Sequence, residues 1–220
     1  MMSTQTSAQE WDAIAALVEE NAEELGAMTT HSELYAWAKE QELATKSKFP
    51  KFKTEIRKQL DLDYDELRAE AKKRYEEELE AKAEALNAES KDGPRVVLNA
   101  AGDAEVDSFA VCKGEKVLWY GTFHPDDKHY DGEQTTADVE AMKKAVWLAT
   151  KIKEAAKVET LMLELHVCNH EVPKPTGACV KAGLGLEFHI EDQGVPALDW
   201  CRENGFQGWR EVALPPLVDM

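Results

Sequence analysis

The chain has 220 residues, a net charge of −17 and 43% hydrophobic residues, which is enough for one medium domain and a smaller one. No stretch approaches the ~20 apolar residues of a membrane span, and the first residues lack the basic and apolar regions of a signal peptide. We therefore expect a cytoplasmic protein without a membrane partner. The acidic charge also disfavours bare nucleic acid as a partner for the chain as a whole.

The first part of the chain predicts three short amphipathic helices, over residues 9–25, about 30–41 and about 50–60. Gly26 is a natural stop for the first, Thr30 or Ser32 a cap for the second, and Pro50 is suited to the start of the third. Together they predict a small helical domain over residues 1–62 that is helix-turn-helix-like.

Residues 46–58 hold six basic residues and one acidic residue within an acidic neighbourhood. In a helix-turn-helix arrangement the later helix enters the groove while lysines hold phosphates. The segment therefore predicts DNA or RNA binding. The residues that would carry it are Lys46, Lys48, Lys51, Lys53, Arg57 and Lys58. The alternative is that these cations balance the acidic first helix of the same domain.

Residues 64–89 predict one long charged helix with a narrow apolar stripe, which makes residues 63–90 a linker. Such a helix is either a spacer or an arm that binds a protein partner or a second copy in a homodimer. Turn residues at 90–94 separate it from a third region, residues 91–220.

The third region alternates strand and helix patterns in a specific order. Strands are predicted over residues 95–100, 108–112 and 116–123, then a helix over about 137–156 and an apolar strand over 160–167. A further helix is predicted over 195–203. The whole chain is therefore expected to be an α+β or α/β protein with a mixed sheet and flanking helices.

The order strand, strand, strand, helix, strand over about 95–167, with a weaker continuation to about 204, resembles the ribonuclease H-like superfamily. That resemblance implies carboxylates on the first strand, at the helix start, on the fourth strand and in a later helix. Here Glu140 matches the helical glutamate, with Thr135 as the helix cap, and Glu164 is the acid of the fourth strand. Asn99 stands at the first-strand position, followed by Asp103 and Asp107, and Asp192 or Asp199 would be the last acid.

The resemblance implies a Mg²⁺- or Mn²⁺-dependent nuclease, in which two ions stabilise the attacking and leaving oxygens of phosphodiester cleavage. Glu140, Glu164 and Asp103 would be catalytic, and the same three with Asp199 would bind the metal. Asn99 supplies an oxygen without charge, so the chain is either a nuclease or an inactive, nucleic-acid-binding derivative. The alternative from another class is a non-catalytic acidic protein, either a scaffold or a nucleic-acid mimic.

Two further patterns involve histidine and cysteine. If the strand continued to residue 170, Glu164, His166, Cys168 and His170 would share one face and could bind zinc with His189 or Cys179; otherwise they form a polar strand end. The four cysteines form no C-x-x-C pair and are expected to be buried. The third region is also similar to acyl-CoA-dependent N-acetyltransferases, although its helix start lacks their phosphate-binding glycines.

Overall fold

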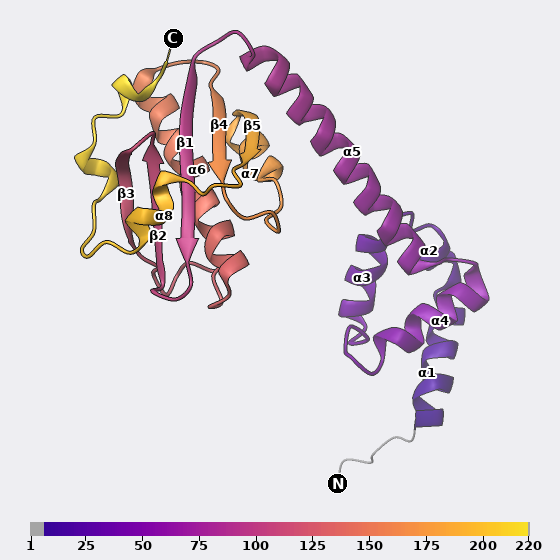
Figure 1. The fold of residues 1–220 in the computed structure, drawn as a ribbon. Helices are drawn as coiled ribbons and strands as arrows, with labels where there is room; N and C mark the ends of the chain where they lie inside the picture. The colour runs from indigo at the N-terminus through magenta and orange to yellow at the C-terminus, as the bar shows by residue number, and fades with distance from the viewer. Residues whose placement is uncertain (1–6, 220) are drawn as a thin grey trace. The chain divides into compact units, whose positions relative to one another are not determined.

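The computed structural model describes residues 7–219, which divide into two compact units at residues 77 and 78 (Figure 1). The chain is an α+β protein with a mixed five-stranded sheet. Among the described residues, no helix is both long enough and apolar enough to cross a membrane.

The first unit is helical, and its core is aromatic and aliphatic. Its helices are α1 (Ser7–Glu20), α2 (Ala22–Gly26), α3 (His31–Glu40), α4 (Phe49–Leu60) and the start of α5 (Tyr64–Ser90). The core contains Val18, Leu34, Trp37, Phe52 and Ile56, with the Trp37 and Phe52 rings stacked at 5.5 Å. The predicted faces of these helices are therefore the buried ones.

Helix boundaries in the first unit follow local capping chemistry. Thr30 is the cap of α3, and its hydroxyl and the Glu33 carboxylate form a reciprocal capping box. Pro50 lies in the first turn of α4, as predicted. The first predicted helix is wrong in one respect: it is interrupted at Asn21, whose side-chain amide donates to the carbonyl of Leu17, which leaves α1 and α2 separate.

Helix α5 is continuous from Tyr64 to Ser90, close to its predicted range. Tyr64 is buried in the core of the first unit. Within the second unit, Asn87 accepts a hydrogen bond of 2.7 Å from the backbone N–H of Leu186. Each end of the helix is thus bound to a different unit by its own side chains.

The second unit is built on a sheet with strand order β3-β2-β1-β4-β5. Its strands are β1 (Arg95–Asp103), β2 (Ser108–Lys113), β3 (Lys116–Thr122), β4 (Met162–Val167) and β5 (Gly185–Ile190). The first three are antiparallel neighbours, whereas β4 lies parallel to β1 and β5 parallel to β4. Parallel strands need a crossover, which α6 (Gln134–Ala156) and α7 (Thr176–Ala182) provide.

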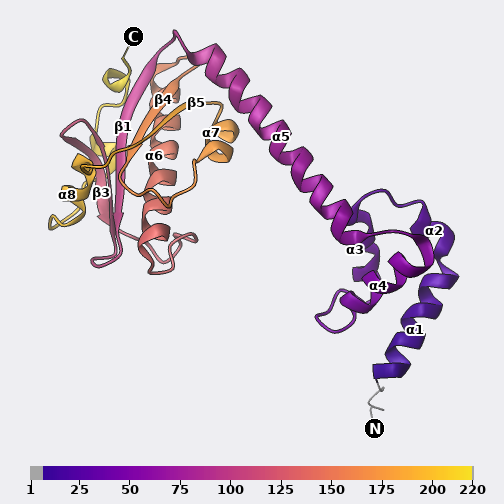
Figure 2. The ribbon, with the colours of Figure 1, turned by 45° about the vertical axis from the view of Figure 1, so that its right-hand side comes forward.

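Different helices cover the two faces of the sheet (Figure 2), and alternating residues of the strands divide the core between these faces. On one face, residues such as Leu98, Val111 and Leu165 pack with the apolar side of α6. On the other, Ala101, Cys112 and their neighbours pack under α8 (Pro196–Cys201). Because α8 contacts β1, β2 and β3, the β4–β5 half of that face is left for polar side chains.

The second unit adds to the predicted elements and corrects the start of α6. Helix α6 begins three residues earlier than predicted, so Thr135 lies inside the helix and Glu133 is the residue before it. Strand β4 ends at Val167, so Cys168 and His170 are not on it. Helix α7 and strand β5 were not predicted. Three cysteines are buried as expected, and burial raises the pKa of Cys112, Cys179 and Cys201 to about 12.

Candidate functional site

A hollow of the second unit lies where β1 and β4 end and α6 begins. Parallel strands end at the same edge of a sheet, so their last residues meet there with the first turn of the crossover helix and with α8. The hollow has a volume of about 530 Å³. It is lined by Asp103, Gln134, Asp138, Cys168, Asn169, His170, Glu171, Leu198 and Arg202.

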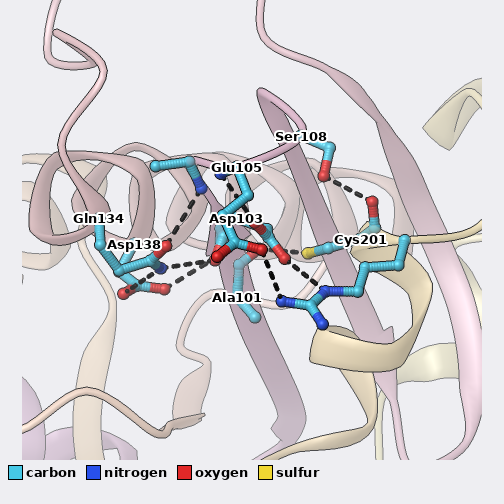
Figure 3. Close-up of polar contacts among 10 residues, drawn as sticks. Ala101, Asp103, Glu105, Ser108, Gln134, Asp138 and Cys201 are labelled. Atoms are coloured by element: carbon cyan, nitrogen blue, oxygen red, sulfur yellow. Dashed lines mark hydrogen bonds and ion pairs between the residues drawn. The ribbon is translucent and has the colours of Figure 1, made fainter.

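Asp138 is the fifth residue of α6 and is 5% exposed. One of its oxygens accepts a hydrogen bond of 3.0 Å from the backbone N–H of Gly102. The other accepts from the side-chain amide of Gln134, at 3.0 Å (Figure 3), and from that of Asn169, at 2.8 Å. Asp138 therefore joins the end of β1, the start of α6 and the segment after β4 through hydrogen bonds within the chain.

Asp103, the last residue of β1, is 2% exposed and forms an ion pair with Arg202. The guanidinium Nε lies 2.7 Å from one carboxylate oxygen, and the backbone N–H of Glu105 donates to the other at 2.9 Å. Burial raises the pKa of Asp103, but the hydrogen bonds from Arg202 and the backbone outweigh it and lower the pKa below its ordinary value. The negative charge of Asp103 is thus neutralised by a cation of the chain itself.

The lowered pKa of Asp103 predicts an acid-sensitive contribution to folding. A carboxyl whose folded pKa is below its unfolded pKa contributes fully above the unfolded value, about 4, and loses the contribution as pH falls through the folded value. Urea unfolding of wild type should therefore show a steeper fall in stability below about pH 4 than that of Arg202→Met, in which Asp103 keeps its burial and its backbone hydrogen bonds but loses the guanidinium. Parallel profiles for the two proteins would contradict the role assigned to this ion pair.

The predicted metal-binding acids are not brought together. Glu164 lies beside Val97, which is six residues, or about 20 Å at ~3.3 Å per residue, from Asp103 along β1. Glu140 is buried on α6, 3.8 Å from Lys144, which also pairs with Asp127. Asp199 is exposed on α8. These four acids therefore do not share one site. Asp103, Glu140 and Glu164 have different surroundings, and Asp199 lies on the surface of α8.

The other residues named from the resemblance also have local partners. Asn99, at the first-strand position, donates to the carbonyl of Gly114 and accepts from the backbone N–H of Ala197, and so fixes the start of α8. Asp107 accepts a hydrogen bond from the Tyr130 hydroxyl, and Asp192 pairs with His170. Of the residues considered for zinc, Glu164, His166 and His189 do lie together.

Helix α8 also covers the end of β1 and is hydrogen-bonded to the sheet there. The thiol of Cys201 donates to the carbonyl of Ala101, and the hydroxyl of Ser108 donates to the carbonyl of Cys201 (Figure 3). Ala101 and Cys201 belong to an apolar cluster that includes Cys168 and Leu198 at the wall of the hollow. One side of the hollow is thus formed by packed apolar side chains rather than by metal-binding groups.

In the first unit, most cations of the basic segment have acidic partners. Lys51 pairs with Glu10 of α1 at 2.6 Å, and Lys53 pairs with Asp65 at 2.5 Å. Arg57 and Lys58 form longer pairs with Asp63 and Glu55. Lys51 thus balances the charge of the first helix, as the alternative interpretation of this segment expected.

A different part of the first unit combines exposed cations with aromatic rings. A hollow of about 610 Å³ lies between α3, α4 and the start of α5. It is lined by His31, Ser32, Tyr35, Ala36, Lys39, Phe49, Tyr64 and Arg68. Phe49 packs edge-on against Tyr35 and Tyr64, at 5.3 and 5.1 Å between ring centroids. Within residues 7–219, neither Lys39 nor Arg68 forms an ion pair.

Comparison with protein-family models, with curated proteins and with solved structures finds no match for this chain. The functional interpretation therefore depends on the geometry of the two units.

Proposed function

We propose that residues 91–220 form a ribonuclease H-like domain that does not cleave nucleic acid, and that the chain is a nucleic-acid-binding protein. The observation that carries the proposal is the hollow of the second unit. It brings together Asp103 at the end of the first strand and Asp138 near the start of the following helix. Asn169 joins them from the end of the fourth strand, and Arg202 from a late helix. The resemblance implies a carboxylate at each of these four places.

The chemistry at the four places argues against a two-metal centre. Hard cations need several anionic oxygens that are free to coordinate. Only two of the four residues are acids, and the oxygens of both already accept hydrogen bonds from the chain. The guanidinium of Arg202 supplies the positive charge that a magnesium ion would supply in a nuclease. We infer that the domain keeps the fold as a scaffold.

A cleavage assay on the full chain tests the loss of activity. Labelled single strands, duplexes and RNA–DNA hybrids are incubated with the protein and Mg²⁺ or Mn²⁺, and parallel samples contain a chelator. We expect the same rate in both. Metal-dependent cleavage that is lost in Asp103→Asn but kept in Glu203→Gln, an exposed acid after α8, would overturn the proposal.

The aromatic and basic hollow of the first unit is the favoured place for nucleic-acid binding. Base–aromatic stacking contributes about 1–3 kcal/mol per base, and cations that hold phosphates make affinity depend on salt. Tyr35 is 44% exposed and adjoins Lys39 and Arg68, so a base on the ring would place its phosphates near both cations. The paired cations of residues 46–58 are less available for this purpose.

Fluorescence anisotropy with labelled single-stranded DNA and RNA at several salt concentrations tests this interface. We expect Arg68→Glu and Tyr35→Ala each to weaken binding about tenfold or more, and Arg68→Glu also to reduce the salt slope by about one. Lys58→Glu, an equal charge change on the exposed face of α4, is the matched control. If Lys58→Glu weakens binding more than Arg68→Glu does, the nucleic-acid interface lies in residues 46–58 instead. Absence of wild-type binding would favour the acidic protein-binding alternative.

A further inference from the structure

A second group of side chains able to bind a metal lies on the β4–β5 half of the sheet face that carries α8, the half that α8 leaves uncovered. Glu164 and His166 are alternate residues of β4, and His189 of β5 is the register partner of His166. The residues between them, Leu163 and Leu165, are buried on the α6 side. The period of two therefore directs Glu164 and His166 to the opposite, polar face.

The ligand atoms of this group are close enough to share one ion. One nitrogen or oxygen from each of Glu164, His166 and His189 lies within 4.8 Å of the other two. His166 Nε2 is 3.0 Å from Glu164 Oε1, and the two imidazole rings stack at 4.7 Å with an angle of 17° between their planes. Ligands at ~2.0–2.1 Å from a tetrahedral zinc are separated by roughly 3.3 Å, so small side-chain rotations suffice.

The surrounding contacts have the form expected around a metal-binding histidine. His166 Nδ1 lies 2.6 Å from Glu191 Oε1, and a carboxylate on the second ring nitrogen fixes the tautomer that leaves Nε2 free to coordinate. Arg95 holds the other oxygen of Glu164 at 3.2 Å, which leaves Oε1 directed at His166. Glu191 thus orients His166, and Arg95 orients Glu164.

Charge and exposure also favour a cation at this place. The side chains of Glu164 and His166 are 20% and 23% exposed, whereas His189 is exposed, so an ion would be partly desolvated and still open on one side. Three carboxylates, those of Glu164, Glu187 and Glu191, belong to this group, whereas Arg95 is the cation that pairs with Glu164, at 3.2 Å, and with Glu187, at 3.6 Å. The local charge without a metal is therefore negative when both histidines are neutral.

We propose that Glu164, His166 and His189 bind a zinc ion, with Glu191 as the positioning residue for His166. Two imidazoles and one carboxylate suit zinc, and three protein ligands leave a fourth position for water or another ligand. The site is separate from the hollow that contains Asp103 and Asp138, and it is independent of the proposed nucleic-acid binding. It also differs from the alternate-residue pattern of one strand, because its third ligand comes from the neighbouring strand.

Titration calorimetry with Zn²⁺ and the visible spectrum of the Co²⁺-loaded full chain test the site. We expect one ion per chain and a tetrahedral cobalt spectrum. His189→Ala, an exposed change, should weaken binding at least tenfold and abolish the spectrum, and Glu191→Gln should weaken binding about 10–100-fold. His170→Ala removes another exposed histidine beside an acid and serves as the matched control.

The competing explanations give different results in the same experiment. Absence of saturable binding would overturn the proposal, and the group would then be a network of hydrogen bonds. Binding that survives in His189→Ala, or that falls equally in His170→Ala, would also overturn it. Circular dichroism of each variant confirms folding, so that a lost ion is not confused with a lost fold.

Discussion

Replacement of Asp138 by alanine is expected to destabilise the second unit by about 3 kcal/mol. Three donors, the N–H of Gly102 and the amides of Gln134 and Asn169, lose their acceptor in a buried place. Each buried donor left unsatisfied costs about 1–3 kcal/mol, partly offset where water enters the hollow. For a unit of this size the loss corresponds to a fall of roughly 10 °C in melting temperature.

The opposite change in melting temperature is expected if Asp138 is a metal-binding acid. Carboxylates gathered for an ion repel one another, so removing one commonly stabilises the metal-free protein. An Asp138→Ala variant that melts at or above the wild-type temperature without added metal would contradict the structural role. Glu203→Ala, an exposed acid close to the same hollow, should change the melting temperature little.

Replacement of Gly102 by alanine is expected to have an effect of similar or greater size, for a different reason. A Cβ at this position would lie 2.4 Å from the backbone carbonyl atoms of Ala137 in the first turn of α6. Neither β1 nor the helix start can move without breaking the hydrogen bonds of Asp138 and Gln134 to Gly102. Overpacking of this kind costs about 1–3 kcal/mol and more where backbone must shift.

Thermal unfolding followed by circular dichroism measures the cost at Gly102. Gly114→Ala is the matched control, because a Cβ there meets no atom within 4 Å and the only penalty is a φ of +55°. That strain costs about 1 kcal/mol. Equal melting temperatures for the two variants would mean that β1 and α6 are not in the close contact described.

The strands and helices around this contact were largely predictable from local patterns. Short, mainly apolar runs predicted β1 to β4, and the apolar stripe of α6 predicted the crossover helix. Helix α7 was missed because seven residues make only about two turns and carry little helical periodicity, and β5 was missed because Glu187 and His189 interrupt its apolar residues. The interruption at Asn21 was missed because the apolar spacing continues across it.

The site was less predictable than the fold, because its contacts join residues far apart in the sequence. The resemblance pointed to Glu140 on this helix, whereas the acid that lines the hollow is Asp138. No sequence pattern links Asp103 to Arg202, which is 99 positions later, or Asn169 to Asp138. The apolar strand pattern placed His166 correctly, but the partner strand that brings His189 beside it was not predicted.

The measurement that tests the non-catalytic assignment most directly is calorimetric titration of Mg²⁺ into His166→Ala/His189→Ala protein, in which the proposed zinc site is removed. The positions of Asp103 and Asp138 predict only the weak, non-saturable heat of an acidic surface, unchanged when Asp103 is replaced by asparagine. Saturable binding of one or two ions that disappears in the Asp103→Asn variant would show an intact metal centre and contradict the assignment.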